Sequence, residues 1–281
     1  MAGQPFTNLI RFEDETGKIQ WGDALPDKLD SLVGSTAKVL DGHPLDGGLK
    51  ITGKTSTIKK VLAPLDTTPV IPCVGMNYLA HIVETKNEIP PSPVVFVKPA
   101  DALAGPYDAI TIPAHALLMD YEVELCLIIA KDCKNVQAAD AKEYILGYTG
   151  GNDLSSRYWQ RPPHSGGQYC YGKGFDAFAP IGPTILNAHA SGVDPSQIDL
   201  TLWVNGEQRQ HTSTGDMVFD VFKIVEFLSN GYTLRKGTII MTGTPSGIAS
   251  RRVPPPWLKN GDVVRIATSQ IGTMENKLVG F

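Results

Sequence analysis

The chain has 281 residues and a formal net charge of −4, with 42% hydrophobic and 19% charged residues. This composition is ordinary for a globular protein and leaves room for one large or two smaller domains. The negative charge argues against nucleic acid as a partner, because phosphate binding requires a clustered basic surface. The longest purely apolar run, residues 125–130, is too short to span a bilayer, so no membrane partner is expected.

The N-terminal residues and the cysteines bear on the cellular location. The first residues have neither the basic and apolar regions of a signal peptide nor the Arg- and Ser-rich pattern of an import leader. The four cysteines, Cys73, Cys126, Cys133 and Cys170, show no CxxC and no zinc-ligand spacing. They are therefore predicted to be free thiols. A cytoplasmic location is expected, with a mitochondrial one left open.

Residues 1–68 are predicted to form a small N-terminal domain. Two short strands, 9–12 and 17–21, surround a turn-forming segment, and Pro- and Gly-rich pieces follow them. No group of chemically active side chains is concentrated here. The turn-rich residues 66–69 are the predicted linker to a second domain, residues 69–281.

The second domain opens with a strand over 70–77 and one or two helical turns over 78–84. In a helix His81 and Glu84 share a face. An imidazole held by a carboxylate can act as a general base, although an ordinary surface pair is the commoner meaning of such a spacing. The proline-rich loop 86–93 that follows suggests a lid over this pair.

A strand is predicted over 119–130, because apolar and acidic residues alternate there at a period of two. One face of this strand carries Asp120, Glu122 and Glu124. Like charges so close repel one another, and burying them unpaired would cost several kcal/mol. A hard divalent cation is the simplest counter-charge. The alternative is an edge strand that exposes its acids to water.

Two further segments concentrate polar groups. Asp153, in the glycine-rich stretch 148–160, could complete a cation site with Glu122 and Glu124, or cap a helix. Lys173 lies between two glycines and could stabilise negative charge that develops in a reaction. A solvated turn is the alternative for this lysine.

The remaining predicted elements are structural. Strands are expected over 94–98, which ends in Lys98, and over 109–113, and a short helix over 140–147. A hairpin is predicted over 200–210 around an Asn-Gly turn, and a helix from Asp216 to Ser229. A strand that begins at 234 runs into a Gly- and Thr-rich turn that ends at 247, and a late strand covers 260–266. That turn lacks the ending of a phosphate loop, but its N–H and hydroxyl groups could bind a carboxylate.

Taken together and in order, these motifs resemble the fumarylacetoacetate hydrolase family over residues 70–281. The motifs are Gly75-Met-Asn-Tyr78 with His81 and Glu84, Phe96-Val-Lys-Pro99, Asp120-Tyr-Glu-Val-Glu-Leu125, Gly151-Asn-Asp153 with Arg157 and Gln160, Gly172-Lys-Gly-Phe-Asp176, Val204-Asn-Gly-Glu-Gln-Arg-Gln210 and Thr242-Gly-Thr-Pro-Ser-Gly247. The resemblance implies an α+β, mainly β fold with a mixed β-roll catalytic domain and a small N-terminal domain. It also implies a homodimer that binds one Mg²⁺ or Mn²⁺ per chain.

The resemblance assigns roles to individual residues. Glu122, Glu124 and Asp153 would be the metal ligands. His81 and Glu84 would be the acid–base dyad on a lid, and Lys173 would stabilise oxyanion or enolate charge. The residues implied to hold the substrate's carboxylate and carbonyl oxygens are Lys98, Arg157, Gln160 and Thr244. One departure is Gly174, which stands where many relatives carry a serine and affects the pocket more than the chemistry.

The implied substrate is a small 2-oxo acid, a β-dicarbonyl compound, which reacts through a metal-bound enolate. Hydrolysis of a C–C bond in an acylpyruvate-type substrate ranks slightly first, because the whole dyad is present. Decarboxylation or keto–enol tautomerisation of oxaloacetate ranks close behind. Two alternatives differ in kind: a structural cation site without catalysis, and a tailoring enzyme of secondary metabolism that condenses or cyclises its substrate on the same scaffold.

Overall fold

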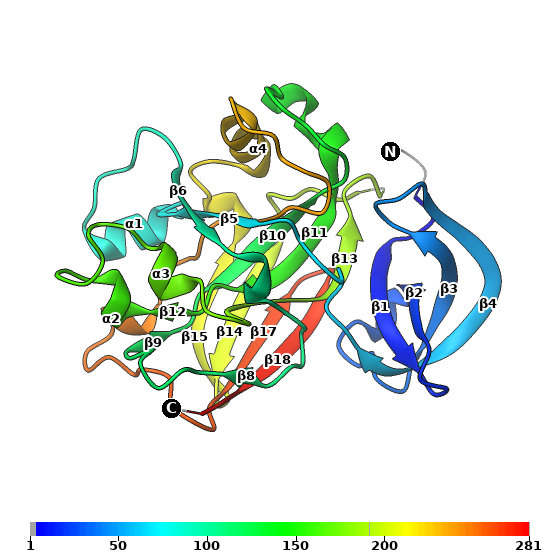
Figure 1. The fold of residues 1–281 in the computed structure, drawn as a ribbon, viewed down its shortest axis with the longest axis horizontal. Helices are drawn as coiled ribbons and strands as arrows, with labels where there is room; N and C mark the ends of the chain where they lie inside the picture. Colours follow the sequence, from blue (N-terminus) through cyan, green and yellow to red (C-terminus); the bar gives the residue numbers. More distant parts are fainter. Residues whose placement is uncertain (1–3, 191, 281) are drawn as a thin grey trace.

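The computed structural model describes residues 4–190 and 192–280, in which strands greatly outnumber helices. This confirms the predicted α+β, mainly β class. The larger of two main sheets has 11 strands (Figure 1). In spatial order they are β2 (Ile19–Ala24), β3 (Thr36–His43), β4 (Gly48–Val61), β1 (Asn8–Asp14), β13 (Ala179–Asn187), β11 (Ile145–Asn152), β10 (Val123–Ile129), β16 (Ile239–Met241), β5 (Ile71–Gly75) and β6 (Val94–Lys98), with β7 (Leu103–Ala104) beside β13.

The second sheet has five strands and packs against the first through β10, β11 and β13. Its strands are, in spatial order, β15 (Glu207–Ser213), β14 (Asp199–Val204), β17 (Val263–Thr268), β18 (Gly272–Val279) and β8 (Ile110–Thr111). A separate short pair joins β9 (Met119–Asp120) to β12 (Ser155–Ser156). The predicted hairpin around Asn205 and Gly206 is confirmed as β14 and β15.

The N-terminal strands β1–β4 pair with one another and enclose a small core of their own, which includes Ile10, Phe12 and Ile58. They form the blue group in Figure 1. β1 also pairs with β13, so this group continues into the large sheet. The domain boundary at residue 68 stays a prediction.

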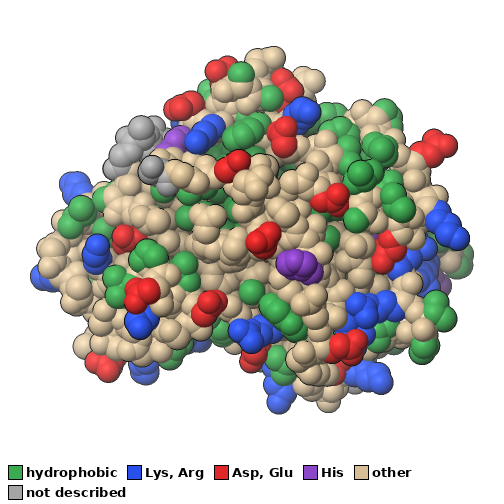
Figure 2. Space-filling view, turned by 180° about the vertical axis from the view of Figure 1, so that it is seen from behind, with side chains coloured by type: hydrophobic (Ala, Val, Ile, Leu, Met, Phe, Trp, Pro, Cys, Tyr) green, Lys and Arg blue, Asp and Glu red, His purple; other side chains and the backbone are tan. Residues whose placement is uncertain are grey.

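Helices are short. The α-helices are α1 (Leu79–Thr85), α2 (Arg157–Gln160), α3 (Cys170–Lys173) and α4 (Val221–Ser229), and the 3₁₀ helices are η1 (Pro26–Lys28), η2 (Ala100–Ala102), η3 (Ala138–Tyr144), η4 (Thr214–Asp216) and η5 (Ala249–Arg251). In the described ranges no helix is long and apolar enough to cross a membrane. Figure 2 shows the face opposite to that of Figure 1, on which acidic and basic side chains are interspersed.

β10 is a central strand with both faces buried. Leu125 and Leu127 belong to the core between the two sheets, whereas Cys126 and Ile128 pack into a second core on the other face. Because side chains alternate along a strand, Glu124 shares the face of Cys126. β10 lies between β11 and β16. The alternative of a solvated edge strand is therefore wrong.

The predicted continuous strand over 119–130 is also wrong, because it is interrupted between β9 and β10. Side chains bind the backbone N–H groups at the interruption. Tyr121 N–H donates to Asp120, Glu122 N–H to Asn152 Oδ1 and Val123 N–H to Gln210 Oε1. These side-chain acceptors replace a neighbouring strand, so the chain can turn here without leaving its N–H groups unpaired.

Two predicted helices need correction. The segment 138–144 is a 3₁₀ helix, and Gly147 lies in β11, so close to the backbone of Leu186 that a Cβ would not fit. The helix α4 begins at Val221, with Asp220 rather than Asp216 as its N-cap. Asp216 instead accepts a hydrogen bond from the backbone N–H of Ala80.

The cap of α4 is a testable feature. Asp220 Oδ1 accepts hydrogen bonds of 2.9 Å from the N–H groups of Phe222 and Lys223. Replacing Asp220 with Ala is expected to lower the free energy of unfolding by about 1 kcal/mol. Urea denaturation measures this loss. Asp220→Asn is the control, because its side-chain oxygen can still accept both bonds. An equal loss in both variants would contradict the capping explanation.

Candidate active site

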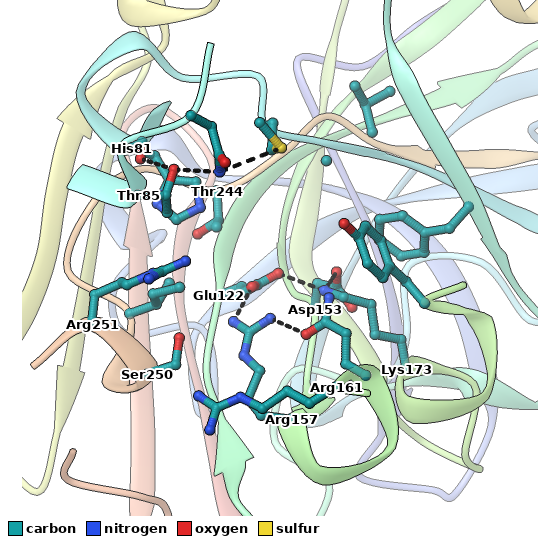
Figure 3. A pocket seen from close by; sticks show the side chains of 18 of the residues that line it. His81, Thr85, Glu122, Asp153, Arg157, Arg161, Lys173, Thr244, Ser250 and Arg251 are labelled. Carbon is teal, nitrogen blue, oxygen red and sulfur yellow. Dashed lines mark hydrogen bonds and ion pairs between the residues drawn. The ribbon is translucent and has the colours of Figure 1, made fainter. Parts of the chain in front are cut away.

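One cavity of about 430 Å³ collects most of the residues that the sequence singled out. Its walls come from β5, α1, β6, the start of β10, α2, α3 and the segment 244–251 (Figure 3). These segments lie far apart in the chain. Pairing of β10 with β11 and β16, and of β16 with β5, brings them to one place.

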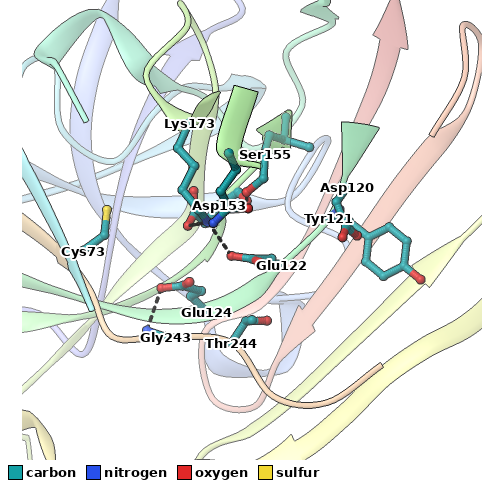
Figure 4. A network of polar contacts seen from close by, with 12 residues as sticks. Cys73, Asp120, Tyr121, Glu122, Glu124, Asp153, Ser155, Lys173, Gly243 and Thr244 are labelled. Atoms are coloured by element: carbon teal, nitrogen blue, oxygen red, sulfur yellow. Dashed lines mark hydrogen bonds and ion pairs between the residues drawn. The ribbon is translucent and has the colours of Figure 1, made fainter. Parts of the chain in front are cut away.

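Three buried carboxylates, which Figure 4 shows side by side, line this cavity. Glu124 lies at the start of β10, Glu122 directly precedes this strand, and Asp153 follows the paired strand β11. The N–H of Asp153 donates to the carbonyl oxygen of Glu122 over 2.9 Å, which holds the two residues together. One oxygen from each of the three side chains lies within 4.8 Å of the others. The strand pairing thus brings together the predicted ligand set.

Three cations neutralise part of this cluster, and two of them, Lys173 and Arg157, also line the cavity. Lys173 Nζ donates to Glu122 Oε2 at 2.7 Å and also to Asp153, and Arg157 pairs with Glu122. Burial opposes ionisation of Glu122, but Arg157 and Lys173 together lower its pKa to about 2. Burial likewise opposes the charge of Lys173, but Asp153 and Glu122 raise its pKa. These groups are therefore charged at neutral pH.

Glu124 lacks such compensation. It accepts a hydrogen bond of 2.7 Å from the backbone N–H of Gly243, and no lysine or arginine of the described residues lies within 4 Å of its carboxylate. Burial and the charges of Asp153 and Glu122 raise its pKa well above the usual value. Carboxylate oxygens are the preferred ligands of hard divalent cations. The three carboxylate ligands and the lack of a positive charge beside Glu124 therefore fit a metal ion.

Asp120, the third acid of the predicted strand face, lies outside this triad. Its carboxylate accepts hydrogen bonds from Arg157 Nε at 2.8 Å and from the backbone N–H groups of Ala249 and Ser250 at 2.7 and 3.1 Å. Asp120 ends β9, whereas Glu122 lies in the interruption that follows and Glu124 lies in β10. Asp120 therefore joins α2 to η5 instead of facing the cavity.

A histidine–carboxylate pair lies at the opposite wall, on α1. His81 lines the cavity, and its Nδ1 is 3.0 Å from Glu84 Oε2. Burial acts to raise the pKa of Glu84, but hydrogen bonds from His81 and from the N–H of Gly247 lower it overall. An ionised Glu84 requires a proton on Nδ1, which leaves Nε2 as the nitrogen that can take up a proton.

Of the predicted substrate-binding residues, Arg157, Gln160 and Thr244 line the cavity. Arg157 donates to Gln160 Oε1 at 2.7 Å, which orients the amide. Gln210 donates to Thr244 Oγ1 at 2.9 Å. The structure thus brings these three side chains to the same cavity as the acid triad, while their predicted roles stay predictions.

The position of Lys98 does not support its predicted role. It is fully buried and does not line the cavity. Its Nζ donates to the carbonyl oxygens of Leu154, Lys173 and Phe178 at 3.2, 2.5 and 2.8 Å, and pairs with Asp153 Oδ1 at 2.6 Å. With its donors engaged in this way, Lys98 supports Asp153 and the backbone of α3 rather than contacting a substrate.

Two basic side chains in the cavity wall, Arg161 and Arg251, were not predicted from the sequence. Arg161 follows Gln160 directly, and Arg251 follows the glycine- and threonine-rich turn by a few residues. Neither belongs to a motif that was recognised. The one feature of the sequence that could have indicated them is their closeness to recognised motif residues. Many surface arginines also lie close to such residues.

A mainly β fold with a cavity that joins a buried acid triad, a lysine and a histidine–carboxylate pair defines this protein as an enzyme. Comparison with known proteins agrees with this class. A family model described as "Fumarylacetoacetate (FAA) hydrolase C-terminal" matches residues 70–279. The chain belongs to the fumarylacetoacetate hydrolase family.

Three relatives illustrate this membership. A fumarylacetoacetate hydrolase domain-containing protein 2 homolog of Dictyostelium discoideum is 40% identical over 78% of this chain and 74% of its own. A mitochondrial oxaloacetate tautomerase of Bos taurus is 39% identical over 78% of this chain and 69% of its own. The solved structure of a 2-hydroxyhepta-2,4-diene-1,7-dioate isomerase from Mycobacterium marinum matches with a TM-score of 0.81 and 36% identity, covering 98% of each chain.

Proposed function

We propose that this protein is a divalent-cation-dependent keto–enol tautomerase of oxaloacetate or a closely related 2-oxo dicarboxylate. The observation that carries the proposal is the single cavity that joins the His81–Glu84 pair to the triad of Glu122, Glu124 and Asp153. The names of the relatives support it: one is an oxaloacetate tautomerase and another an isomerase of an unsaturated dioate.

The triad would hold Mg²⁺ or Mn²⁺, both of which accept carboxylate ligands and keep open positions for other oxygens. When bound, the cation acts as a Lewis acid that withdraws electron density from a 2-oxo acid and so acidifies the carbon next to the keto group. Arg157 and Gln160 would orient the adjacent carboxylate. Three of the five N–H donors of Arg157 already bind Asp120, Gln160 and Glu122, which fixes the direction of the other two.

The protein's own side chains then move one proton. His81 Nε2 takes it from the carbon next to the keto group, and Glu84 stabilises the imidazolium that forms. The Lys173 ammonium stabilises the negative oxygen of the resulting enolate. Delivery of the proton to that oxygen gives the enol, and the reverse path gives the keto acid. No carbon–carbon bond breaks and no water is consumed.

Hydrolysis of an acylpyruvate-type substrate, ranked first from the sequence, is the second candidate. It is favoured by the completeness of the His81–Glu84 pair, since the same base could activate water towards a distal carbonyl. Decarboxylation of oxaloacetate and a biosynthetic condensation use the same enolate and differ only in the bond that breaks or forms. The names of the relatives support tautomerisation as the first candidate.

One assay separates these reactions. Purified protein with Mg²⁺ is given oxaloacetate and, separately, acetylpyruvate, and enol decay, CO₂ release and C–C cleavage are followed independently. We expect accelerated enol–keto conversion of oxaloacetate that EDTA abolishes and Mg²⁺ restores. Cleavage of acetylpyruvate without acceleration of tautomerisation would replace the proposal with the hydrolase. No reaction with either compound, with metal bound, would refute both and indicate a larger or biosynthetic substrate.

Lys173 offers a test of the electrostatic step. Lys173→Met keeps much of the side-chain volume but removes the charge that faces Glu122 and Asp153. We expect kcat to fall about 100-fold with a smaller change in KM, because charge stabilisation matters most in the transition state. Steady-state kinetics on oxaloacetate measure both constants. A rise in KM at constant kcat would show that Lys173 serves binding alone.

Two further expectations accompany the proposal. We propose a homodimer, which multi-angle light scattering of the purified protein tests directly. We also propose a cytoplasmic or mitochondrial location, the latter because the oxaloacetate tautomerase of Bos taurus that the chain resembles is mitochondrial. Fractionation of cells that produce the untagged protein distinguishes the two compartments.

A further inference from the structure

Arg161 and Arg251 both lie in the cavity wall, and neither forms an ion pair with a described residue. Neither guanidinium has a carboxylate within 4 Å among the residues that the structure describes, whereas Arg157, Arg235 and Arg252 each pair with an acid. Both side chains are exposed at the rim. Figure 3 shows Arg251 and Ser250 across the cavity from Lys173. Among the described residues, the mouth of the cavity therefore carries two cations without an ion-pair partner, in addition to the lysines and the arginine that pair with the triad.

The backbone that carries Arg251 is held by a buried acid. Arg251 ends η5, and the two preceding N–H groups, of Ala249 and Ser250, donate to the carboxylate of Asp120. The same carboxylate accepts a hydrogen bond from Arg157 Nε. One buried group thus sets the position of Arg251 relative to the arginine proposed to orient the substrate's first carboxylate.

Aromatic contact positions Arg161. Its guanidinium carbon lies 5.6 Å from the centre of the Trp257 ring, a cation–π distance that leaves the N–H groups free for another partner. The neighbouring Arg252 behaves differently. It donates hydrogen bonds to the backbone carbonyl oxygens of Gly247 and Arg209 and so has a structural role. Of the two consecutive arginines, Arg251 is the one available to a ligand.

A count of charges shows what the rim cations add. The buried groups around the triad, apart from the histidine–carboxylate pair, comprise four carboxylates and three cations. They are Asp120, Glu122, Glu124, Asp153, Lys98, Arg157 and Lys173. A divalent cation held by the triad changes their net charge from −1 to +1, and the first carboxylate of a 2-oxo acid neutralises it. A second carboxylate on the substrate needs positive charge from elsewhere, because an unpaired ion in a partly dry cavity is costly.

We infer that Arg161 and Arg251 form a second anion subsite, which binds the distal carboxylate of a 2-oxo dicarboxylate and makes the enzyme prefer dicarboxylates to monocarboxylates. The inference deepens the proposed function and rests on it for the placement of the substrate's first carboxylate. Arginine suits this role because its planar N–H groups match a carboxylate. The subsite would explain why two arginines lie unpaired where the cavity opens.

A matched pair of substrates tests the subsite. Oxaloacetate and its 4-methyl ester share the reacting end and differ in the distal charge. For Arg161→Gln and Arg251→Gln we expect KM for oxaloacetate to rise about tenfold in each variant, with kcat nearly unchanged. KM for the ester should stay constant. Arg235→Gln, which removes an exposed arginine elsewhere on the surface, is the control for net charge. An equal KM increase for the ester would overturn the inference.

A binding experiment keeps this test independent of the reaction. Calorimetry with Mg²⁺ present compares malate with 2-hydroxybutyrate, which share a 2-hydroxy acid end and differ in the distal carboxylate. The wild-type protein should bind malate more tightly, and the variant lacking both arginines should lose that preference. If the double variant loses the preference for malate but the wild-type protein does not act on oxaloacetate, the result would support the subsite and refute the proposed function. A preference that survives in the double variant, or its absence from the wild type, would refute the subsite.

Discussion

Replacing Glu124 with Gln is expected to abolish metal-dependent turnover while leaving the protein folded. A Lewis-acid cation supplies several kcal/mol of charge stabilisation in the transition state, and each 1.36 kcal/mol corresponds to a factor of ten in rate. A loss of about 10³-fold in kcat/KM follows if the cation is lost. The glutamine oxygen can still accept the N–H of Gly243, so the turn after β16 keeps its hydrogen bond.

The same substitution has a second consequence that distinguishes a metal site from a structural network. Glu124 is buried without a cationic partner, and its raised pKa reflects the cost of its charge. Without metal, Glu124→Gln should therefore unfold at the same or a higher temperature than the wild type. Calorimetric titration with Mn²⁺ gives a readout other than activity, and the variant should bind the ion much more weakly. Glu275→Gln, on the exposed side of β18, is the matched control. Unchanged ion binding and turnover in Glu124→Gln would remove the metal ion from the proposal.

Replacing His81 with Ala is expected to reduce kcat by about 10²–10⁴-fold, the usual contribution of a general base. The histidine lies on α1, across the cavity from the triad, and its Nε2 is the proposed proton acceptor. Oxalate resembles the enolate form of a 2-oxo acid and would bind at the triad, so its affinity for the variant should stay close to that of the wild type. Kinetics on oxaloacetate and oxalate inhibition measure the two effects.

Glu84→Gln serves as the companion variant for this prediction. A neutral amide no longer stabilises the imidazolium, but it can still accept the N–H of Gly247, so α1 should stay in place. We expect a smaller decrease in kcat than for His81→Ala. If oxalate binding disappears together with turnover in His81→Ala, His81 binds the substrate and another group transfers the proton.

Much of the fold could be predicted from local patterns. The strand β6, the hairpin of β14 and β15 and the helix α1 were predicted from alternation, an Asn-Gly turn and helical spacing. The long strand β4 was missed because it is rich in Lys and Thr and mostly exposed. β13 was missed because both of its faces are buried, which hides any alternation, and because it contains two prolines. Burial on both faces is a property of the assembled sheets and not of the segment.

By itself, the sequence determined the chemistry that is available to this protein. The spacing of Glu122 and Glu124, the later Asp153 and the pair of His81 and Glu84 were sufficient to suggest a cation and a base, and the order of the motifs indicated the family. These conclusions rest on residue type and local spacing, which a strand or a helical turn converts directly into a shared face.

Only the tertiary structure decided which charged groups face the cavity. Asp120 stands in the same motif as Glu122 and Glu124, and Lys98 stands in a separate recognised motif. In the structure Asp120 binds η5 and α2, and Lys98 pairs with Asp153 without lining the cavity. Arg161 and Arg251 lie in no recognised motif, yet both line the cavity. The reason is physical: buried charges must find partners, and their partners come from strands and turns that lie far apart in the chain until the sheets form.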